Sequence, residues 1–172
     1  VLVRLLKDID IIIRRLSIEG LASLSARETL PYIVEAIKDT DPEVRRKAVK
    51  AVGVMGNISS VDNLLSCAED SDLLVRIEAA NALLRISNKD ALPILLTLLK
   101  DNDIYAASFA ADNLALCIDE DSIPLIAPLL PELKEHVRMR VVKALCKISG
   151  QNYGENPEEW LKWCENKSSQ QD

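Results

Sequence analysis

The stretch KDTDPEVRRKAVKAVGVMG, residues 38–56, contains an acidic turn, a proline and then a run whose apolar residues recur with helical spacing. EDSDLLVRIEAANALLRIS, residues 69–87, repeats it 31 residues later, with the aspartates, the Val-Arg pair and the small apolar residues in register. Recurrence at a fixed period of this length is typical of repeat proteins, in which one supersecondary unit is stacked several times. The sequence therefore predicts a stack of similar units.

The repeat extends through most of the chain. Shifting the sequence by 31 residues superposes, without insertion, five segments that begin at Asp8, Asp39, Asp70, Asp101 and Glu132. We expect the array to occupy residues 1–150, in repeat units 1–25, 26–56, 57–87, 88–118 and 119–150. A cap helix and a polar tail are expected in residues 151–172.

Each unit contains two helix-like runs joined by a tight turn. The longer, second run places Val44, Ala48 and Val52 on one helical face. The shorter, first run opens with an acidic residue and a proline, as in DALPILLTLLK (residues 90–100), and a proline in the first turn costs no intrahelical hydrogen bond. One hairpin alone cannot bury its apolar face, so the pattern predicts an all-α fold of about five stacked helical hairpins.

The Asp-x-x-x-Arg turns (DPEVR and DLLVR), the proline of the first helix and the 31-residue unit resemble the short HEAT-like repeats of bacteria and archaea, the type also found in phycobilisome lyases. The resemblance implies a right-handed α-α superhelix, or solenoid, with the second helix of each pair along its concave surface. It also implies a ladder of hydrogen bonds between successive repeats, formed by Asp10, Arg14, Asp41, Arg45, Asp72 and Arg76. Ala107 and Lys134 depart from this pattern in the fourth and fifth repeats.

The two ends of the array differ from its middle. In GENPEEWLKWCEN, residues 154–166, Asn156 is expected to cap a last helix whose tryptophans, Trp160 and Trp163, cover the final hairpin. At the other end the first short helix has no upstream neighbour in this sequence, and its apolar residues are expected to be exposed and to favour self-association. These residues are Val1, Leu2, Leu5 and Leu6.

Composition narrows the functional classes. The net charge is −6, from 21 basic and 27 acidic residues, whereas nucleic-acid binding begins with a cationic surface. Charged residues interrupt every apolar run before it reaches the length of a membrane span. The start, VLVRLLKDID, lacks the order of a signal peptide. We therefore expect a cytoplasmic protein that binds neither nucleic acid nor membrane.

No residue pattern indicates catalysis, a metal or a cofactor. Cys67, Cys117 and Cys146 fall at interior positions of the repeat, without a Cys-x-x-Cys pair, and only Cys164 is expected to meet solvent. The single histidine, His136, lies in a turn and is interpreted as a surface residue, because no nucleophile is placed beside it. A non-enzyme is therefore expected. By the resemblance, a phycobilin-lyase-like or other enzyme-accessory protein is the alternative, and a purely structural spacer is another.

The candidate binding residues form an outward stripe on the second helices, and their chemistry varies while the core positions stay apolar. We interpret the stripe as a surface for a partner protein or peptide on the concave side. Its residues are Lys47, Lys50 and Val54; Glu78, Asn81 and Arg85; Phe109, Asp112 and Leu116; Arg140, Lys143 and Lys147.

Phe109 is the one aromatic residue in this stripe. Leu116 follows seven residues later, so the two are expected to form an apolar shelf on one helix face and a hot spot for binding. In the alternative interpretation, Phe109 fills the space left where Ala107 replaces the ladder arginine.

Overall fold

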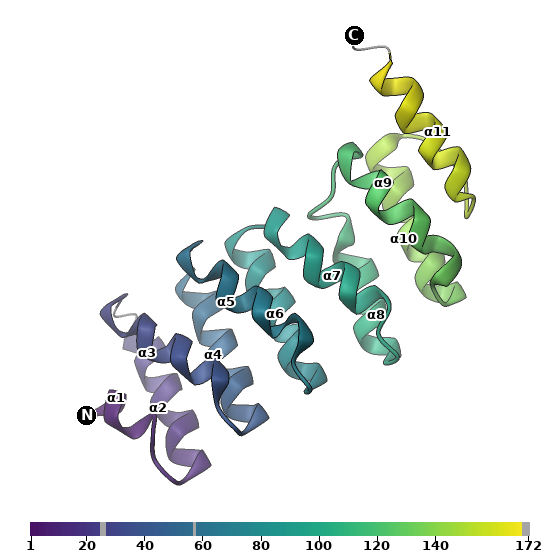
Figure 1. The fold of residues 1–172 in the computed structure, drawn as a ribbon. Coiled ribbons are helices and arrows are strands. Elements are labelled where there is room, and N and C mark those ends of the chain that lie inside the picture. The colour runs from purple at the N-terminus through teal and green to yellow at the C-terminus, as the bar shows by residue number, and fades with distance from the viewer. Residues whose placement is uncertain (25–26, 57, 170–172) are drawn as a thin grey trace. The chain divides into compact units, whose positions relative to one another are not determined.

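The computed structural model describes residues 1–24, 27–56 and 58–169, and every regular element in these ranges is a helix. The expected all-α fold of stacked helical hairpins is confirmed (Figure 1). The chain forms two compact units, unit 1 (Val1–Ile94) and unit 2 (Leu95–Asp172). The division falls within the fourth expected repeat, and helix α7 (Leu92–Leu99) spans it.

Unit 1 is built from short first helices and longer second helices (Figure 1). The second helices are α2 (Ile11–Leu24), α4 (Pro42–Met55) and α6 (Leu73–Ile86). The first helices are α1 (Leu2–Leu5), α3 (Leu30–Glu35) and α5 (Val61–Leu65). Turns of 3-10 helix accompany them: η1 (Arg27–Thr29), η2 (Ala36–Lys38), η3 (Ile58–Ser60), η4 (Ser66–Glu69) and η5 (Lys89–Ala91).

Unit 2 repeats this construction and adds a last helix. Its second helices are α8 (Ile104–Leu114) and α10 (Glu135–Ser149). The short helix α9 (Ile123–Ile126) lies between η6 (Glu120–Ser122) and η7 (Ala127–Glu132), and α11 (Pro157–Ser168) ends the fold. The expected repeat boundaries at residues 25–26 and 56–57, and the tail at residues 170–172, lie on or beside residues outside the described ranges. Within those ranges no helix has both the length and the apolar composition needed to cross a bilayer.

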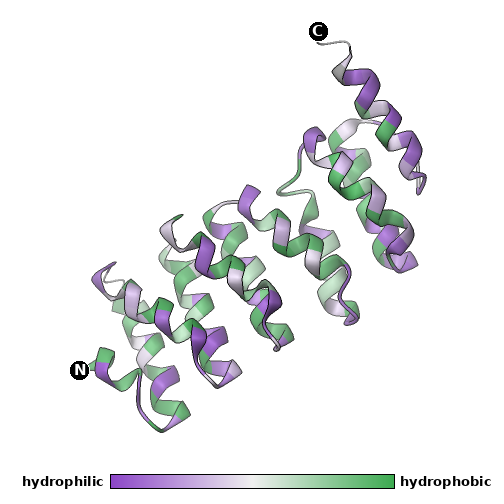
Figure 2. Ribbon diagram, viewed as in Figure 1, coloured by the Kyte–Doolittle hydropathy of each residue, from purple (hydrophilic) through white to green (hydrophobic). Residues whose placement is uncertain are grey.

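Local sequence explains where the second helices begin and end. Before α4, the Asp41 carboxylate accepts hydrogen bonds from the N–H groups of Glu43 at 2.9 Å and Val44 at 3.2 Å, which satisfies donors that have no partner inside the helix. The helix ends at Gly56, whose φ of 64° is left-handed and favours a residue without a Cβ. The turn that leads into α4 is hydrophilic, whereas the helices carry mixed faces (Figure 2).

The core of unit 1 is made of small apolar residues on adjacent second helices. Val44, Ala48 and Val52 of α4 are completely buried, and α4 packs on both α2 and α6. Gly53 makes the α4–α6 contact very close, because a Cβ at this position would lie 2.6 Å from the Cβ of Ala82. The hairpins therefore stack through their second helices at a separation that side-chain size controls.

The cap helix of unit 2 packs by one of its two tryptophans. Trp160 is completely buried, its indole N–H donates to the carbonyl of Gly154 at 2.9 Å, and Tyr153 meets its ring edge-on at 5.1 Å. Trp163 is only half-buried and lies under the ammonium of Lys167. Asn156 accepts from the N–H of Glu158 at 3.0 Å, as its capping role predicts.

Candidate functional site

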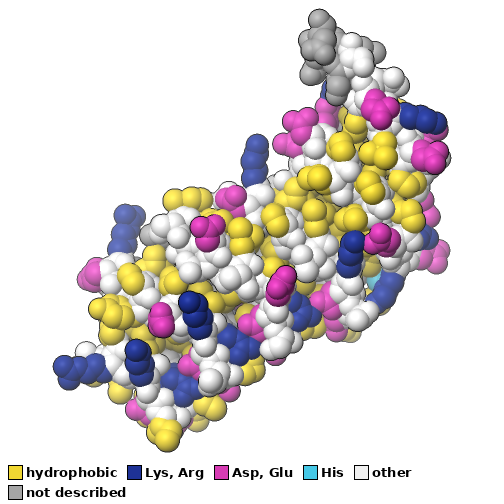
Figure 3. Space-filling view, in the orientation of Figure 1, with side chains coloured by type: hydrophobic (Ala, Val, Ile, Leu, Met, Phe, Trp, Pro, Cys, Tyr) yellow, Lys and Arg dark blue, Asp and Glu magenta, His cyan; other side chains and the backbone are white. Residues whose placement is uncertain are grey.

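Two arginines join neighbouring repeats of unit 1 through paired hydrogen bonds to aspartates. Arg14 donates from Nε and Nη2 to the two carboxylate oxygens of Asp39, at 2.8 and 2.9 Å. Arg45 makes the same pair of bonds to Asp70, both at 2.7 Å. Figure 3 shows basic and acidic side chains alternating along this edge of unit 1. Two-bond pairs between guanidinium and carboxylate are charge-assisted and fix geometry as well as adding energy.

The acidic half of this ladder differs from the sequence prediction. The arginines pair with the first aspartate of each Asp-x-Asp turn, whereas the prediction assigned the second one. The carboxylates of the second aspartates are occupied by N–H groups at the start of the following helix. Those residues are Asp10, Asp41 and Asp72. The first aspartate accepts one backbone N–H through a single oxygen, as Asp39 does from Asp41 at 2.9 Å, and is aimed at the neighbouring arginine.

Each arginine also fixes the turn of its own repeat. Nη1 donates to a turn carbonyl in all three cases: Arg14 to Asp8 at 2.8 Å, Arg45 to Asp39 at 3.0 Å and Arg76 to Asp70 at 2.8 Å. For Arg14 and Arg45, one guanidinium therefore holds its own turn and binds the next repeat. The ladder is a structural device, and it keeps the second helices in register.

Unit 2 maintains the inter-repeat links with other residues. Ala107, at the arginine position, is completely buried. The Lys134 ammonium donates to the carbonyl of Asn102 in the preceding repeat at 2.8 Å. Arg138 lies 2.7 Å from a carboxylate oxygen of Glu155, in the segment before α11. The last repeat arginine is thus linked to the cap instead of to a further repeat.

Electrostatics in the ladder follow from partial burial. The side chains of Arg45 and Asp70 are only 14% and 11% exposed. Burial raises the pKa of Asp70, but the hydrogen bond and charge of Arg45, with the N–H of Asp72, outweigh it and hold that pKa below its ordinary value. The Asp70 hydrogen bond raises the pKa of Arg45 despite burial. The pair is therefore ionised over the whole neutral range.

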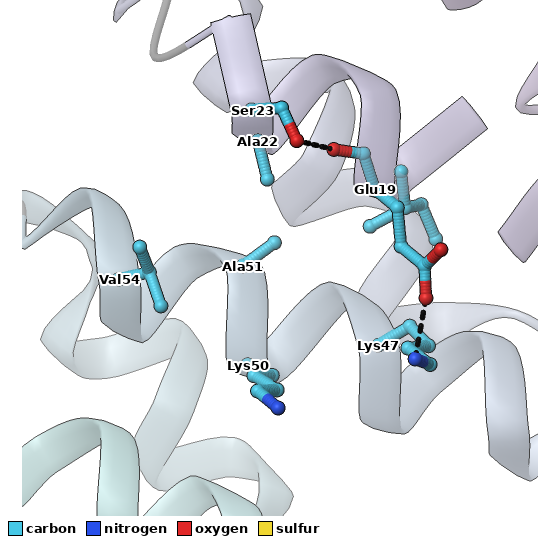
Figure 4. Close-up of a pocket in the computed structure, with 8 residues that line it drawn as sticks. Glu19, Ala22, Ser23, Lys47, Lys50, Ala51 and Val54 are labelled. Atoms are coloured by element: carbon cyan, nitrogen blue, oxygen red, sulfur yellow. Dashed lines mark hydrogen bonds and ion pairs between the residues drawn. The ribbon is translucent and has the colours of Figure 1, made fainter. Parts of the chain in front are cut away.

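An open groove of about 410 Å³ lies between α2 and α4 of unit 1. Ala22 and Ala51 point into the space between the helices, and an ion pair between Glu19 and Lys47 crosses it (Figure 4). The Lys47 hydrogen bond and charge lower the pKa of Glu19. Lys50, also on the groove, is exposed and forms no ion pair with any described residue. We call this the α2–α4 groove.

A second groove, of about 380 Å³, lies between α8 and α10 of unit 2, and has the same construction. An ion pair between Asp112 and Arg140 crosses it, at the same separation of 28 residues as Glu19 and Lys47. Two further lysines, Lys143 and Lys147, line it, together with Ala111, Ala115 and Ala144. We call this the α8–α10 groove. In both grooves an acid on one second helix pairs with a base on the next.

The structure thus brings six of the twelve stripe residues named from the sequence into two grooves and adds Val54 to one of them. Lys47 and Lys50 line the first with Val54; Asp112, Arg140, Lys143 and Lys147 line the second. The sequence interpretation missed Glu19 and Ser23 of the first repeat. The 31-residue register contains them, because Glu19 corresponds to Lys50 and Ser23 to Val54.

The other stripe residues lie outside these grooves. Glu78 and Asn81 of α6 are half-buried and Arg85 is exposed. Phe109 is half-buried, and Leu116 is 55% exposed but lies beyond the end of α8 at Leu114. The Asn113 side-chain amide donates to the carbonyl of Phe109 at 2.9 Å, where a local side chain competes with helical bonding. The expected shelf of Phe109 and Leu116 on one helix face is therefore wrong.

The N-terminal edge is also less exposed than expected. Leu6 is buried and Leu2 and Leu5 are half-buried, because α1 packs on α2, with Leu2 beside Gly20. Val1 is 98% exposed. Further exposed apolar residues come from the following turn and α2 instead: Ile9, Ile12 and Leu16.

The thiols and the histidine offer little reactivity. Burial raises the pKa values of Cys67 and Cys117 to about 11, so both are protonated thiols at neutral pH. Cys146 is half-buried, as is Cys164. His136 is half-buried too, and its Nε2 is covered without a hydrogen-bond partner among the described residues. The interpretation of His136 as a solvated surface residue is therefore wrong.

Comparison with known proteins gives a consistent family and fold. The sequence model for HEAT repeats matches residues 1–83 and 52–107, more than half of the chain. A chain of the complex of CpcE and CpcF of phycocyanin lyase from Nostoc sp. PCC7120 is similar in structure, with a TM-score of 0.64 and 23% identity. The match covers 87% of this chain and 64% of that one, so this chain spans less than two thirds of that protein.

Two artificial proteins are similar as well. An engineered protein gives a TM-score of 0.55 at 21% identity, with 86% of this chain and 77% of that chain covered. A designed armadillo repeat protein gives 0.54 at 20% identity, with 96% and 86% covered. No curated protein sequence matches this chain. At these identities the structural matches show the fold.

Proposed function

Because the chain belongs to the HEAT repeat family, whose stacked helical hairpins are a protein-interaction fold, we propose that it is a non-enzymatic interaction module or scaffold. In this proposal the exposed sides of the second helices bind a segment of a partner protein or a peptide. The binding residues are those that line the α2–α4 and α8–α10 grooves.

The repeated groove construction carries this proposal. Each groove has alanines on its lining and one ion pair that crosses between adjacent second helices. The remaining lining residues differ, with Lys50 and Val54 in one and Lys143 and Lys147 in the other. A fixed construction with variable lining residues supports recognition, since a purely structural spacer has no need of open grooves with unneutralised charge.

A pair of crosslinking positions with equal exposure tests this proposal. Val54 lines the α2–α4 groove and is 58% exposed, whereas Ile58 lies outside it and is 63% exposed. A photo-crosslinking amino acid at residue 54 should capture one stoichiometric protein from native lysate, and the same group at residue 58 should not. Equal capture at both positions, or none at residue 54, would contradict groove binding.

Phe109→Ala provides an independent test of the sequence-based hot spot. Binding of the captured protein should weaken while the thermal midpoint stays within a few degrees of wild type, because Phe109 is only half-buried. A large loss of stability would instead place Phe109 in the core.

The similarity to a chain of the CpcE–CpcF complex supports a second candidate function, as an enzyme-accessory or lyase-like protein that acts with a protein partner. Mixing the purified chain with a free bilin tests it directly. A shifted absorbance band would support this candidate, and an unchanged spectrum would leave the interaction module as the better proposal.

A further inference from the structure

The α8–α10 groove has more positive charge than its own carboxylate neutralises. Three basic side chains and one acidic side chain line it, for a net charge of +2. The acid, Asp112, is held by Arg140, whose Nη1 lies 2.6 Å from Asp112 Oδ2. Lys143 and Lys147 are exposed and form no ion pair with the residues that the structure describes. Their charges are therefore available to a ligand.

The spacing of these lysines restricts what they match. Lys143 and Lys147 are four residues apart on α10, so they lie one above the other on the same helix face. A ligand that neutralises both needs two anionic groups about 5–6 Å apart. Carboxylates four residues apart on a helix, or two residues apart on an extended segment, meet this requirement.

The lining beside the lysines suits a polypeptide. Ala111, Ala115 and Ala144 have short side chains, which leave an open groove of about 380 Å³. Small residues allow a backbone or a small apolar side chain to approach closely. Cations along one side and methyl groups on the floor together match an amphipathic acidic segment.

The charge of the surrounding sequence disfavours a nucleic-acid strand. Residues 101–122 contain six acidic residues and neither Lys nor Arg, and Asp112 of this segment stands on the groove itself. A phosphodiester strand carries one negative charge per nucleotide and would meet these carboxylates on continuing beyond the two lysines. A short peptide can end its acidic stretch where the cations end.

We propose that the α8–α10 groove binds an acidic peptide segment, with two carboxylates paired to Lys143 and Lys147 and a small apolar side chain on the alanine floor. This rests on the proposed function as an interaction module and specifies the chemistry of its partner. The Asp112–Arg140 pair keeps the groove acid from repelling that segment.

The test uses the whole chain and a defined peptide. The peptide is a blocked 15-residue Ala/Leu sequence with glutamates spaced four apart, and its control has glutamine in place of every glutamate. In amide chemical-shift titrations, the glutamate peptide should shift Ala111, Ala115 and Ala144, and the glutamine peptide should bind on the order of ten-fold more weakly. Raising the salt concentration should reduce the difference.

Matched charge variants locate the interaction. Lys143→Gln/Lys147→Gln should lower affinity for the glutamate peptide on the order of ten-fold. Lys38→Gln/Lys162→Gln changes the net charge equally, at exposed lysines outside this groove, and should leave affinity unchanged. Ala115→Phe fills the groove without altering charge and should also weaken binding. Circular dichroism melting checks that each variant is folded.

Several outcomes would overturn the inference. They are the absence of shifts at millimolar glutamate peptide, equal binding of the glutamine peptide, equal loss with the two charge variants, or tighter binding of a 15-nucleotide single strand. If any of these occurs while the crosslinked partner at residue 54 is still captured, the acidic-ligand inference fails and the interaction-module function stands. The reverse result would reject the proposed function alone.

Discussion

Arg45 donates two hydrogen bonds of 2.7 Å to Asp70 of the next repeat and a third, of 3.0 Å, to the Asp39 carbonyl of its own turn. One side chain therefore satisfies a carboxylate across the repeat interface and orders the turn that precedes its own helix. Because repeat proteins are stabilised largely by contacts between neighbours, this link should contribute strongly to stability.

Arg45→Ala should lower the free energy of unfolding by about 2–4 kcal/mol, because it leaves the largely buried Asp70 carboxylate without its cation. The midpoint of urea unfolding measures this. Arg85→Ala removes an exposed arginine that has no ion pair within the described residues and should change stability by less than about 0.5 kcal/mol. Equal midpoints for the two variants would mean that the link is energetically neutral.

The two aspartates of one turn should respond differently to the same substitution. Asp70→Asn removes the charge that Arg45 binds and should cost about 1.5–3 kcal/mol. Asp72→Asn keeps an oxygen that accepts the N–H of Leu74, now at 2.9 Å, and should cost a few tenths of a kcal/mol, since asparagine also caps helices well. Urea unfolding of both variants makes the comparison, and a larger loss for Asp72→Asn would restore the assignment first made from the sequence.

Stability should depend on pH through Asp70. Its folded pKa lies below its ordinary value, so the unfolded chain takes up this proton first as the pH falls. The stabilisation is therefore fully present above the unfolded pKa, about 3.9, and is lost as the pH falls through the folded pKa. The difference in unfolding free energy between wild type and Asp70→Asn should be constant from pH 7 to 5 and shrink below pH 4. A difference independent of pH down to pH 2.5 would contradict this.

Two helix-interior glycines should give opposite results when replaced by alanine. A Cβ at Gly53 would lie 2.6 Å from Ala82 Cβ and 2.8 Å from its Cα, so a helix must move. We expect a loss of about 1–3 kcal/mol from overpacking. At Gly20 the nearest atom is the end of the Leu2 side chain, at 3.1 Å, and the gain in helix propensity should make Gly20→Ala neutral or stabilising by up to about 1 kcal/mol. Thermal melting of the two variants tests the contrast.

The exposed apolar residues at the N-terminal edge should cause weak self-association. Ile12 and Leu16 of α2 are 61% and 59% exposed, close to Val1 and Ile9 in sequence. Sedimentation equilibrium should show a mass above the monomer at high concentration, and Ile12→Lys/Leu16→Lys should abolish it. Leu125→Lys, at a residue 60% exposed in unit 2, serves as the control and should associate like wild type. A monomer at every concentration would contradict the expectation.

The period of the sequence predicted most of the fold because the same physical needs recur in every unit. Asp41 and Asp72 mark helix starts because backbone N–H groups there need an acceptor. The apolar spacing of Val44, Ala48 and Val52 identifies the buried face without further information. Such signals are local, so a single sequence is enough to recognise them.

The details that the sequence did not predict depend on geometry within one turn. Asp39 and Asp41 have identical side chains two residues apart, and only the direction of each carboxylate decides which one meets Arg14 and which one caps α4. The early end of α8 before Leu116 accompanies a hydrogen bond from the Asn113 side chain, for which the helical period gives no signal. Glu19 was missed although its register position was available.

The buried Trp160 makes the two units separately observable. Both tryptophans of the chain, Trp160 and Trp163, lie in α11, so intrinsic indole fluorescence reports the unfolding of unit 2 and is silent about unit 1. Far-ultraviolet circular dichroism reports helices in both. Superimposable denaturation curves from the two signals would indicate one cooperative transition, whereas displaced curves would give each unit its own stability in a single unlabelled sample.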